Sequence, residues 1–217
     1  MTYARHLIEL NRLEEARAEF LELLQQSPND DDLRFSLALI NMDLNAWREA
    51  QVYLEELLEH GSHTNAAYFH LGRVFEELEN TQQAIEAYKA VQPVEGYLAS
   101  QQRIITLLLA DQRLKEATTY FDTQRIEQPS LAIQLYLIEV ENLANNNQVE
   151  TAWLRINQAL DDFTDDPSLL YTRAMIADKR NDLAQLEQDL RLIIKRNPKS
   201  AMALNALGYT LADRTDR

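Results

Sequence analysis

The amino-acid sequence predicts an all-α protein built from a helix pair that repeats along the chain. The first observation is composition, because only four Gly and five Pro occur among 217 residues while helix-forming residues are abundant. Such a chain has few places to turn a hairpin. The second observation is a period of about 34 residues, which is typical of helical repeat arrays. An apolar fraction of 46% can fill a substantial core, so residues 1–217 are expected to form a single array.

The period is set by a small or compact residue that lies between apolar neighbours. Successive members are 34, 34, 33, 35, 34 and 34 residues apart. We expect each member to lie on the first helix of a pair, where a small side chain lets two helices approach closely. This first series comprises Ala4, Ala38, Gly72, Ile105, Val140, Ala174 and Gly208.

A second series runs about twelve residues behind the first and keeps the same spacing. Each member is followed four residues later by a large apolar side chain. Four residues are about one helical turn, so the two side chains share one face of a second helix. The small or apolar members are Ala16, Ala50, Ala84, Ala117, Ala152 and Leu186, and the large members are Phe20, Leu54, Tyr88, Phe121, Ile156 and Leu190.

Polar residues separate the two series, and prolines lie near the ends of the repeats, so each repeat is expected to be helix, turn, helix and break. The turn residues are Asn45, Asn80, Asp111, Asn146 and Asn181, and the prolines are Pro28, Pro93, Pro129, Pro167 and Pro198. The predicted repeats are residues 1–30, 31–64, 65–97, 98–132, 133–166 and 167–200, with a half repeat at 201–217.

This pattern resembles the tetratricopeptide repeat in its period, its two helices and most of its preferred residue types. The resemblance is clearest at Tyr68, Leu71, Gly72, Phe75, Ala84, Tyr88 and Pro93. It implies a right-handed superhelical solenoid of about six helix pairs and a final unpaired helix, with the first helices lining an inner surface. The stretch 98–125 departs most from the family pattern.

Both ends of the sequence cut through a repeat, and repeat arrays normally finish with a polar cap. Tyr3, Ala4 and Leu7 occupy contact positions of a first helix that lacks its initial turn. We therefore expect the chain to be a segment of a longer array. In the alternative, the final helix is itself the cap.

A partner-binding surface is predicted from the repeat positions that face the inner side. Relative to each residue of the first series, these positions lie three before, one after and four after. Many of them are apolar or aromatic, which favours a groove for an apolar segment of a partner protein. In the alternative, the same side chains pack between repeats. The predicted residues, called here the inner-face residues, are Phe35, Leu39, Met42, Phe69, Arg73, Glu76, Leu109, Leu137, Glu141, Tyr171, Met175, Asn205 and Tyr209.

The best-known peptide-binding members of the family grip a C-terminal carboxylate with Lys, Arg and Asn on this inner face. Here Arg5 and Arg73 are the only basic residues at inner positions, and they lie two repeats apart. No carboxylate clamp is therefore expected.

No catalytic, cofactor or metal site is predicted. His60, His63 and His70 have a spacing that a metal could use, but they have no Cys and no further clear ligand. The acidic runs at 30–32 and 161–166 lack the glycine and the terminal glutamate of a calcium-binding loop. They precede predicted helices, whose positive ends carboxylates favour. Nucleophilic triads and phosphate-binding loops are also missing from the sequence.

Charge and composition narrow the partner classes. A net charge of −14 disfavours binding to nucleic acid and to anionic membranes. No apolar run reaches the roughly 18 residues of a membrane span, so direct membrane insertion by this segment is not expected. The absence of Cys excludes disulfides and thiolate chemistry.

We expect a non-catalytic scaffold or adaptor for a protein or peptide partner. Residues 169–214 are similar to bacterial tetratricopeptide proteins, including envelope lipoproteins that act as adaptors for periplasmic proteases. That similarity implies a lipid-anchored parent in the periplasm or outer membrane and a protease partner. Cytoplasmic scaffolds carry the same helix pattern, so both compartments stay open. Two other functions also stay open: a regulatory or substrate-recruiting array of a larger enzyme, and self-association in which residues 201–213 dock onto residues 1–10 of a neighbour.

Overall fold

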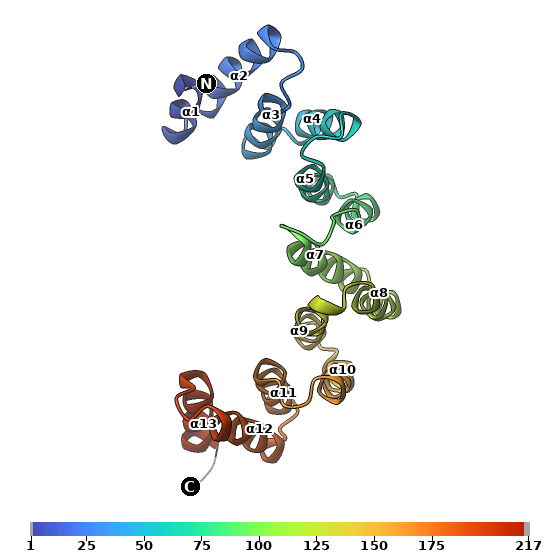
Figure 1. Ribbon diagram of the computed structural model, residues 1–217, viewed down its shortest axis with the longest axis vertical. Helices are drawn as coiled ribbons and strands as arrows, with labels where there is room; N and C mark the ends of the chain where they lie inside the picture. Colours follow the sequence, from blue (N-terminus) through green and yellow to red (C-terminus); the bar gives the residue numbers. More distant parts are fainter. Residues whose placement is uncertain (1, 215–217) are drawn as a thin grey trace. The chain divides into compact units, whose positions relative to one another are not determined.

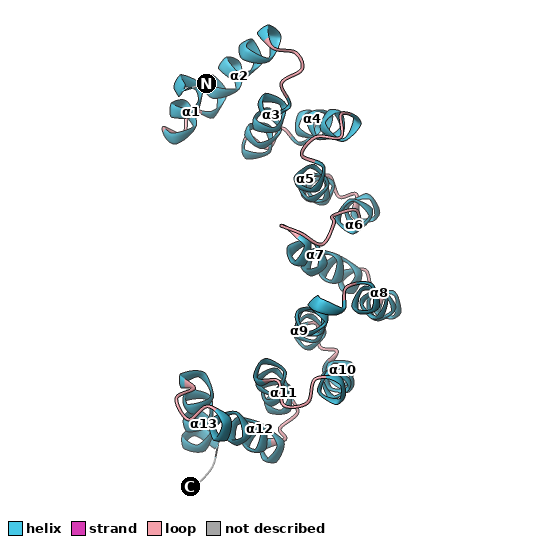
Figure 2. Ribbon diagram, viewed as in Figure 1, coloured by secondary structure: helices cyan, strands magenta, loops and turns pink. Residues whose placement is uncertain are grey.

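The computed structural model describes residues 2–214 (Figure 1). Within this range the chain forms thirteen α-helices and one short 3-10 helix, and no strand is present (Figure 2). The all-α prediction is therefore confirmed. Residue 1 and residues 215–217, which belong to the predicted first and last repeats, lie outside the described range.

The helices follow the predicted order of first and second helices. The first helices are α1 (Thr2–Glu9), α3 (Asp31–Asp43), α5 (Thr64–Glu77), α7 (Tyr97–Ala110), α9 (Ala132–Asn145), α11 (Pro167–Lys179) and α13 (Ala201–Arg214). The second helices are α2 (Leu13–Gln26), α4 (Trp47–Glu59), α6 (Thr81–Lys89), α8 (Leu114–Glu127), α10 (Val149–Asp162) and α12 (Leu183–Arg196). The 3-10 helix η1 (Pro129–Leu131) precedes α9. Within residues 2–214, no helix has both the length and the apolar character needed to cross a membrane.

Each helix pair turns through one residue with a positive φ angle. The following amide then donates a hydrogen bond to a carbonyl five residues earlier, as from Ala46 N to Asn41 O (2.8 Å) and from Asp182 N to Ala177 O (2.8 Å). This geometry ends a helix at a left-handed residue and satisfies its last carbonyls. The left-handed residues are Asn11, Asn45, Glu79, Gln112, Asn147 and Asn181.

The chain divides into two compact units, residues 1–107 and residues 108–217, and the division falls inside α7. In the first unit, α1 packs on α2, α2 on α3, α3 on α4, α4 on α5 and α5 on α6. The repeat-series side chains fill its core, as predicted from their shared helix faces. The buried members include Ala4, Ala16, Phe20, Ala38, Ala50, Leu54, Ala84 and Tyr88.

Gly72 is a point of close helix contact, as predicted. A Cβ atom at this position would lie 2.5 Å from Cε1 of Tyr88, which is on the paired helix α6. The corresponding prediction for Gly208 is wrong, because a Cβ atom there would meet nothing within 4 Å. The reason is that no second helix follows α13 within the described residues, so no side chain takes the place of Tyr88.

The second unit carries buried ion pairs between its helices. Glu139 on α9 is fully buried, and it accepts hydrogen bonds from Arg125 on α8 (2.7 Å) and from Arg155 on α10 (2.9 Å). Burial raises the pKa of Glu139, and the two guanidinium groups oppose that rise. Arg173 on α11 forms a two-pronged pair with buried Asp189 on α12, at 2.7 and 2.8 Å. These pairs link α9 to α8 and α10, and α11 to α12.

Candidate protein-binding surface

The inner-face residues of the first unit gather on α3 and α5. Phe35 is half-buried, and its ring stacks on that of His63 with centroids 4.9 Å apart and an interplanar angle of 3°. Phe69 is also half-buried, and its ring meets His70 and Tyr88 edge-on, at 5.7 and 5.8 Å. These two aromatic side chains therefore pack against neighbouring side chains while part of each surface stays open.

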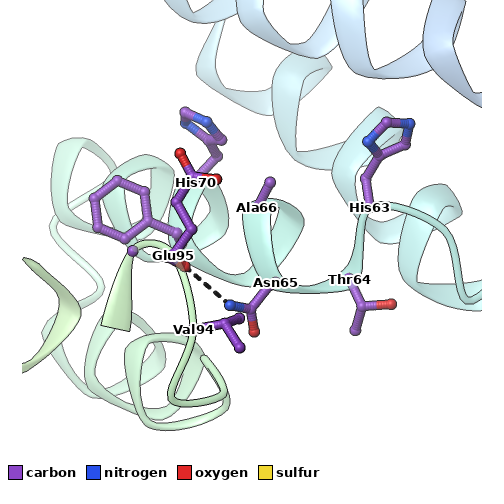
Figure 3. Close-up of a pocket in the computed structure, with 9 residues that line it drawn as sticks. His63, Thr64, Asn65, Ala66, His70, Val94 and Glu95 are labelled. Atoms are coloured by element: carbon purple, nitrogen blue, oxygen red, sulfur yellow. Dashed lines mark hydrogen bonds between the residues drawn. The ribbon is translucent and has the colours of Figure 1, made fainter. Parts of the chain in front are cut away.

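A cavity of about 510 Å³ opens beside Phe69, between the start of α5 and the loop that precedes α7. In Figure 3 the side chains of His63, Ala66 and His70 rise on the same side of α5, and Glu95 reaches toward His70 from the loop. We call this cavity the α5 pocket. Its lining includes His63, Ala66, Phe69, His70, Val94 and Glu95.

The side chain of Asn65 holds in place the loop that lines one side of the α5 pocket. Asn65 donates from Nδ2 to the carbonyl oxygens of Gln92 (3.3 Å) and Glu95 (3.0 Å), and its Oδ1 accepts from the amide of Gln92 (2.7 Å). The bond to Glu95 is the dashed line in Figure 3. Gly96 then leaves the loop at a φ of 86°, a conformation that favours glycine. These contacts hold the loop against the start of α5.

His70 gives the α5 pocket a polar group without a protein partner. Its Nδ1 atom is buried and makes no hydrogen bond to any described residue. Burial and, to a smaller extent, the charge of Arg73 together lower the pKa of His70 to about 4. The imidazole is therefore neutral at pH 7, with one nitrogen that donates and one that accepts.

A second cleft, of about 370 Å³, also borders Phe69, and its other lining residues are charged. Glu76 accepts hydrogen bonds there from the Tyr88 hydroxyl (2.6 Å) and from Nε of Arg103 (2.9 Å). Burial first, and then the bond to Glu76, raises the pKa of Tyr88. We call this the charged cleft, and it holds Phe69, Arg73, Glu76, Glu77 and Arg103. Two open spaces of different polarity therefore share the Phe69 side chain.

The other inner-face residues differ in exposure. Met42 is 5% exposed and Leu109 is 9% exposed, so these two side chains belong to the core and not to an open surface. Helical spacing alone misplaced them, because it does not say how much of each helix position is covered by neighbouring side chains. Leu39, Leu137, Tyr171 and Met175 are half-buried, and Glu141, Asn205 and Tyr209 are exposed. Partner binding by these seven residues stays a prediction.

The second unit has a cavity that the sequence did not point to. It measures about 450 Å³ and lies among α8, η1, α9 and α10, with Ile126, Tyr136 and Phe163 in its lining. The Arg125 guanidinium lies 4.0 Å from the centre of the Tyr136 ring. Ile126 is 81% exposed. This apolar residue among polar ones near the end of a second helix was the only feature of the sequence that could have indicated the cavity.

The histidines and acidic runs considered for metals have contacts of another kind. His60 Nδ1 lies 2.8 Å from Asp31 Oδ1, and His63 Nε2 lies 2.9 Å from Asp32 Oδ1. Asp30 caps α3 by accepting from the amide of Leu33 (3.1 Å). Across residues 2–214, no group of three His, Cys, Asp or Glu side chains is placed to hold a metal ion. Asp30 therefore caps α3, and the two histidine–aspartate contacts join the start of α3 to the segment between α4 and α5.

Comparisons with known proteins agree with the repeat pattern. The family model described as tetratricopeptide repeat matches residues 2–50 and 35–96. A TPR repeat-containing protein of Pseudomonas aeruginosa is 55% identical over 153 residues, which are 70% of this chain and 26% of the relative. The matched part thus spans about a quarter of the length of that relative.

Two solved structures share the fold at low sequence identity. One is the C-terminal part of a TPR repeat-containing protein from Cytophaga hutchinsonii, with a TM-score of 0.55 and 15% identity over 97% of this chain and 94% of the other. The second is PilF of Pseudomonas aeruginosa, with a TM-score of 0.52 and 13% identity over 96% of this chain and 95% of the other. At these identities the likeness extends to the fold alone.

Proposed function

Because this chain is a tetratricopeptide repeat protein in sequence and in fold, we propose that it is a non-catalytic scaffold that binds a partner protein through the inner face of its first helices. Tetratricopeptide repeat proteins generally mediate protein–protein interaction. The finer proposal concerns which surface of this chain is used and what kind of partner it accepts.

The observation that carries the proposal is the arrangement around Phe69. One side chain borders both the apolar α5 pocket and the charged cleft, and exposed Arg73 stands at the rim. Interfaces concentrate binding energy in aromatic and arginine side chains beside well-formed pockets. This combination fits a protein segment that carries both an apolar anchor and charged groups.

We also propose that the partner is a protease in the bacterial envelope. This rests on the similarity of residues 169–214 to envelope adaptor lipoproteins, and the Pseudomonas aeruginosa relative is consistent with a bacterial source. A cytoplasmic scaffold is the alternative. The identity of the bound partner distinguishes the envelope adaptor from the cytoplasmic scaffold.

Self-association is a second candidate because apolar side chains are exposed near both chain ends. Tyr3 and Leu10, which lie in and beside α1, are 57% and 52% exposed, and Leu204 and Tyr209 on α13 are 44% and 70% exposed. Measurement of molecular mass by light scattering over a range of protein concentrations tests self-association. A mass that rises with concentration, and falls when Leu204 and Tyr209 are changed to Ser, would support it, and a constant monomer mass would exclude it.

The scaffold proposal is tested by affinity capture from the source organism with three baits. The first is the native chain, and the second carries Phe69→Ala and Arg73→Glu. The third is a matched control with Val52→Ser and Leu154→Ser, which alter exposed apolar residues on the second helices α4 and α10. A partner that the native and control baits retain and the second bait loses is the expected result. Equal capture by all three baits would contradict binding through the inner face.

A further inference from the structure

A groove of about 380 Å³ lies between the second helices α4 and α6, and the first helix α5, which packs on both, contributes to its lining. Within the described residues, no residue of this lining also lines the α5 pocket or the charged cleft. We call this space the Ala87 groove. Leu58 and Tyr68 are half-buried, so apolar surface in the groove is open to solvent. The apolar lining residues are Leu58, Tyr68, Leu71, Phe75 and Ala87.

The groove is open at this repeat because α6 carries a small residue where the other second helices carry a longer one. Counted three residues on from the second series, Ala87 corresponds to Glu19, Tyr53, Tyr120, Arg155 and Asp189. On α10 the longer side chain reaches the paired first helix, since Arg155 donates to Glu139 (2.9 Å), which takes the place that Leu71 has on α5. The methyl group of Ala87 cannot reach across in this way, so this chain leaves the space above it unfilled.

The charged residues that line the Ala87 groove are acidic. Its polar lining residues are Glu55, Gln82, Gln83 and Glu86. Glu86 is exposed and pairs with Lys89 on its own helix (3.3 Å). Glu55 is also exposed; it accepts a hydrogen bond from Gln51 (2.7 Å) and, among residues 2–214, forms no ion pair. A chain of net charge −14 repels acidic proteins, further copies of itself included, so the groove is complementary to a basic partner.

We propose that the Ala87 groove binds an amphipathic helix of a basic partner protein, whose apolar side chains lie in the groove and whose lysine or arginine side chains face Glu55 and Glu86. Laying the apolar face of a helix into an apolar groove is a common mode of peptide recognition. Opposite charges at the rim raise the association rate and select against acidic partners. A partner held here contacts a different set of residues from one held at Phe69. The chain can therefore bind two proteins at once, which goes beyond the scaffold function proposed above.

The test uses a fluorescently labelled synthetic peptide in which pairs of leucine alternate with pairs of lysine, and its binding to the chain is measured by fluorescence anisotropy at physiological ionic strength. In two matched peptides, glutamate replaces lysine or serine replaces leucine. We expect saturable binding of the leucine–lysine peptide with a Kd on the order of 100 μM. Each matched peptide should bind about 10-fold more weakly or less. No binding of the leucine–lysine peptide, or equal affinity for the serine–lysine peptide, would overturn the proposal.

A variant that fills the groove tests its place on the chain. Ala87→Tyr introduces the side chain that α4 and α8 carry at this repeat position, so it suits the fold and leaves the net charge unchanged. It should weaken binding of the leucine–lysine peptide by about 10-fold. Ala18→Tyr makes the same change at an exposed site on α2 and should leave the affinity unchanged. Native affinity in an Ala87→Tyr chain whose circular dichroism is that of the native chain would overturn the groove assignment.

Charge variants separate the groove from general attraction to an acidic chain. Glu55→Gln combined with Glu86→Gln should weaken peptide binding by about 3- to 10-fold. Glu22→Gln combined with Glu127→Gln removes the same charge from exposed sites on α2 and α8 and should change it little. An equal loss in the two double variants would contradict the groove. The Phe69→Ala chain should keep the native affinity, and loss of peptide binding there would place the peptide on the inner face instead.

Discussion

Replacing Gly72 with Ala should destabilise the first unit, although alanine is the better helix former. The added methyl group would lie 2.5 Å from the Tyr88 ring. That ring cannot move aside freely, because it is fully buried, its hydroxyl donates to Glu76, and its edge meets Phe69. The helix pair α5 and α6 must therefore separate to accept the methyl group.

The magnitude follows from two opposing effects. Overpacking of a well-filled core costs about 1–3 kcal/mol, while Gly→Ala inside a helix gains about 1 kcal/mol. Gly208 offers the matched control, since a methyl group there meets nothing within 4 Å and only the helix gain applies. The Gly72→Ala protein should thus be about 1–3 kcal/mol less stable than the Gly208→Ala protein.

Amide hydrogen exchange is the suitable assay, because repeat arrays do not unfold as one cooperative unit and exchange reports local stability. Protection of α5 and α6 should fall in Gly72→Ala, and protection of α13 should rise in Gly208→Ala. Removing the ring with Tyr88→Ala should make the Gly72→Ala change stabilising in that background. If Gly72→Ala raised protection in the otherwise native chain, the close-contact reasoning would be refuted.

Three further predictions concern buried and capping groups. Glu139→Leu should destabilise the second unit by roughly 1.5–3 kcal/mol, because buried Arg125 and Arg155 lose their charged hydrogen bonds to Glu139 and keep only the carboxylate of Asp122; urea unfolding followed by circular dichroism would show no loss if the pair were unimportant. Asp30→Ala should cost about 1 kcal/mol by removing the cap of α3, and unchanged exchange at the start of α3 would contradict this. The folded-state pKa of His70 is lowered from 6.5 to about 4. The contribution of the neutral imidazole to folding stability is therefore fully present above pH 6.5 and is lost as the pH falls toward 4. Relative to His70→Leu, the native chain should lose about 3 kcal/mol of folding free energy over that range, and equal acid sensitivity of the two chains would contradict this prediction.

The fold could be predicted from the sequence because the same spacing of small and large apolar residues recurs in every repeat. The spacing of Ala16 and Phe20, repeated in every pair, placed the core face of the second helices correctly. The inner face was harder to predict, since helical spacing does not say how much of a helix its neighbours cover. Met42 and Leu109 share their repeat positions with half-exposed residues, yet both are buried.

Only part of the candidate site could be predicted from the sequence. Phe69, Arg73 and Glu76 were predicted as a group because they share one helix face, and the charged cleft brings them together. Val94, Glu95 and the anchoring role of Asn65 were missed, since they depend on how the loop before α7 folds back onto α5. The sequence showed Pro93 near that loop, which indicated a break but not the path of the loop.

The central claim, that a partner binds the inner face around Phe69, is tested most directly by site-specific photocrosslinking in cells. A photoreactive residue at exposed Arg73, on the rim of the charged cleft, is compared with one at Val52, which is 52% exposed on α4. We predict a crosslink to one partner protein from position 73 and none from position 52. Crosslinking to that partner from position 52 but not from position 73 would contradict the claim.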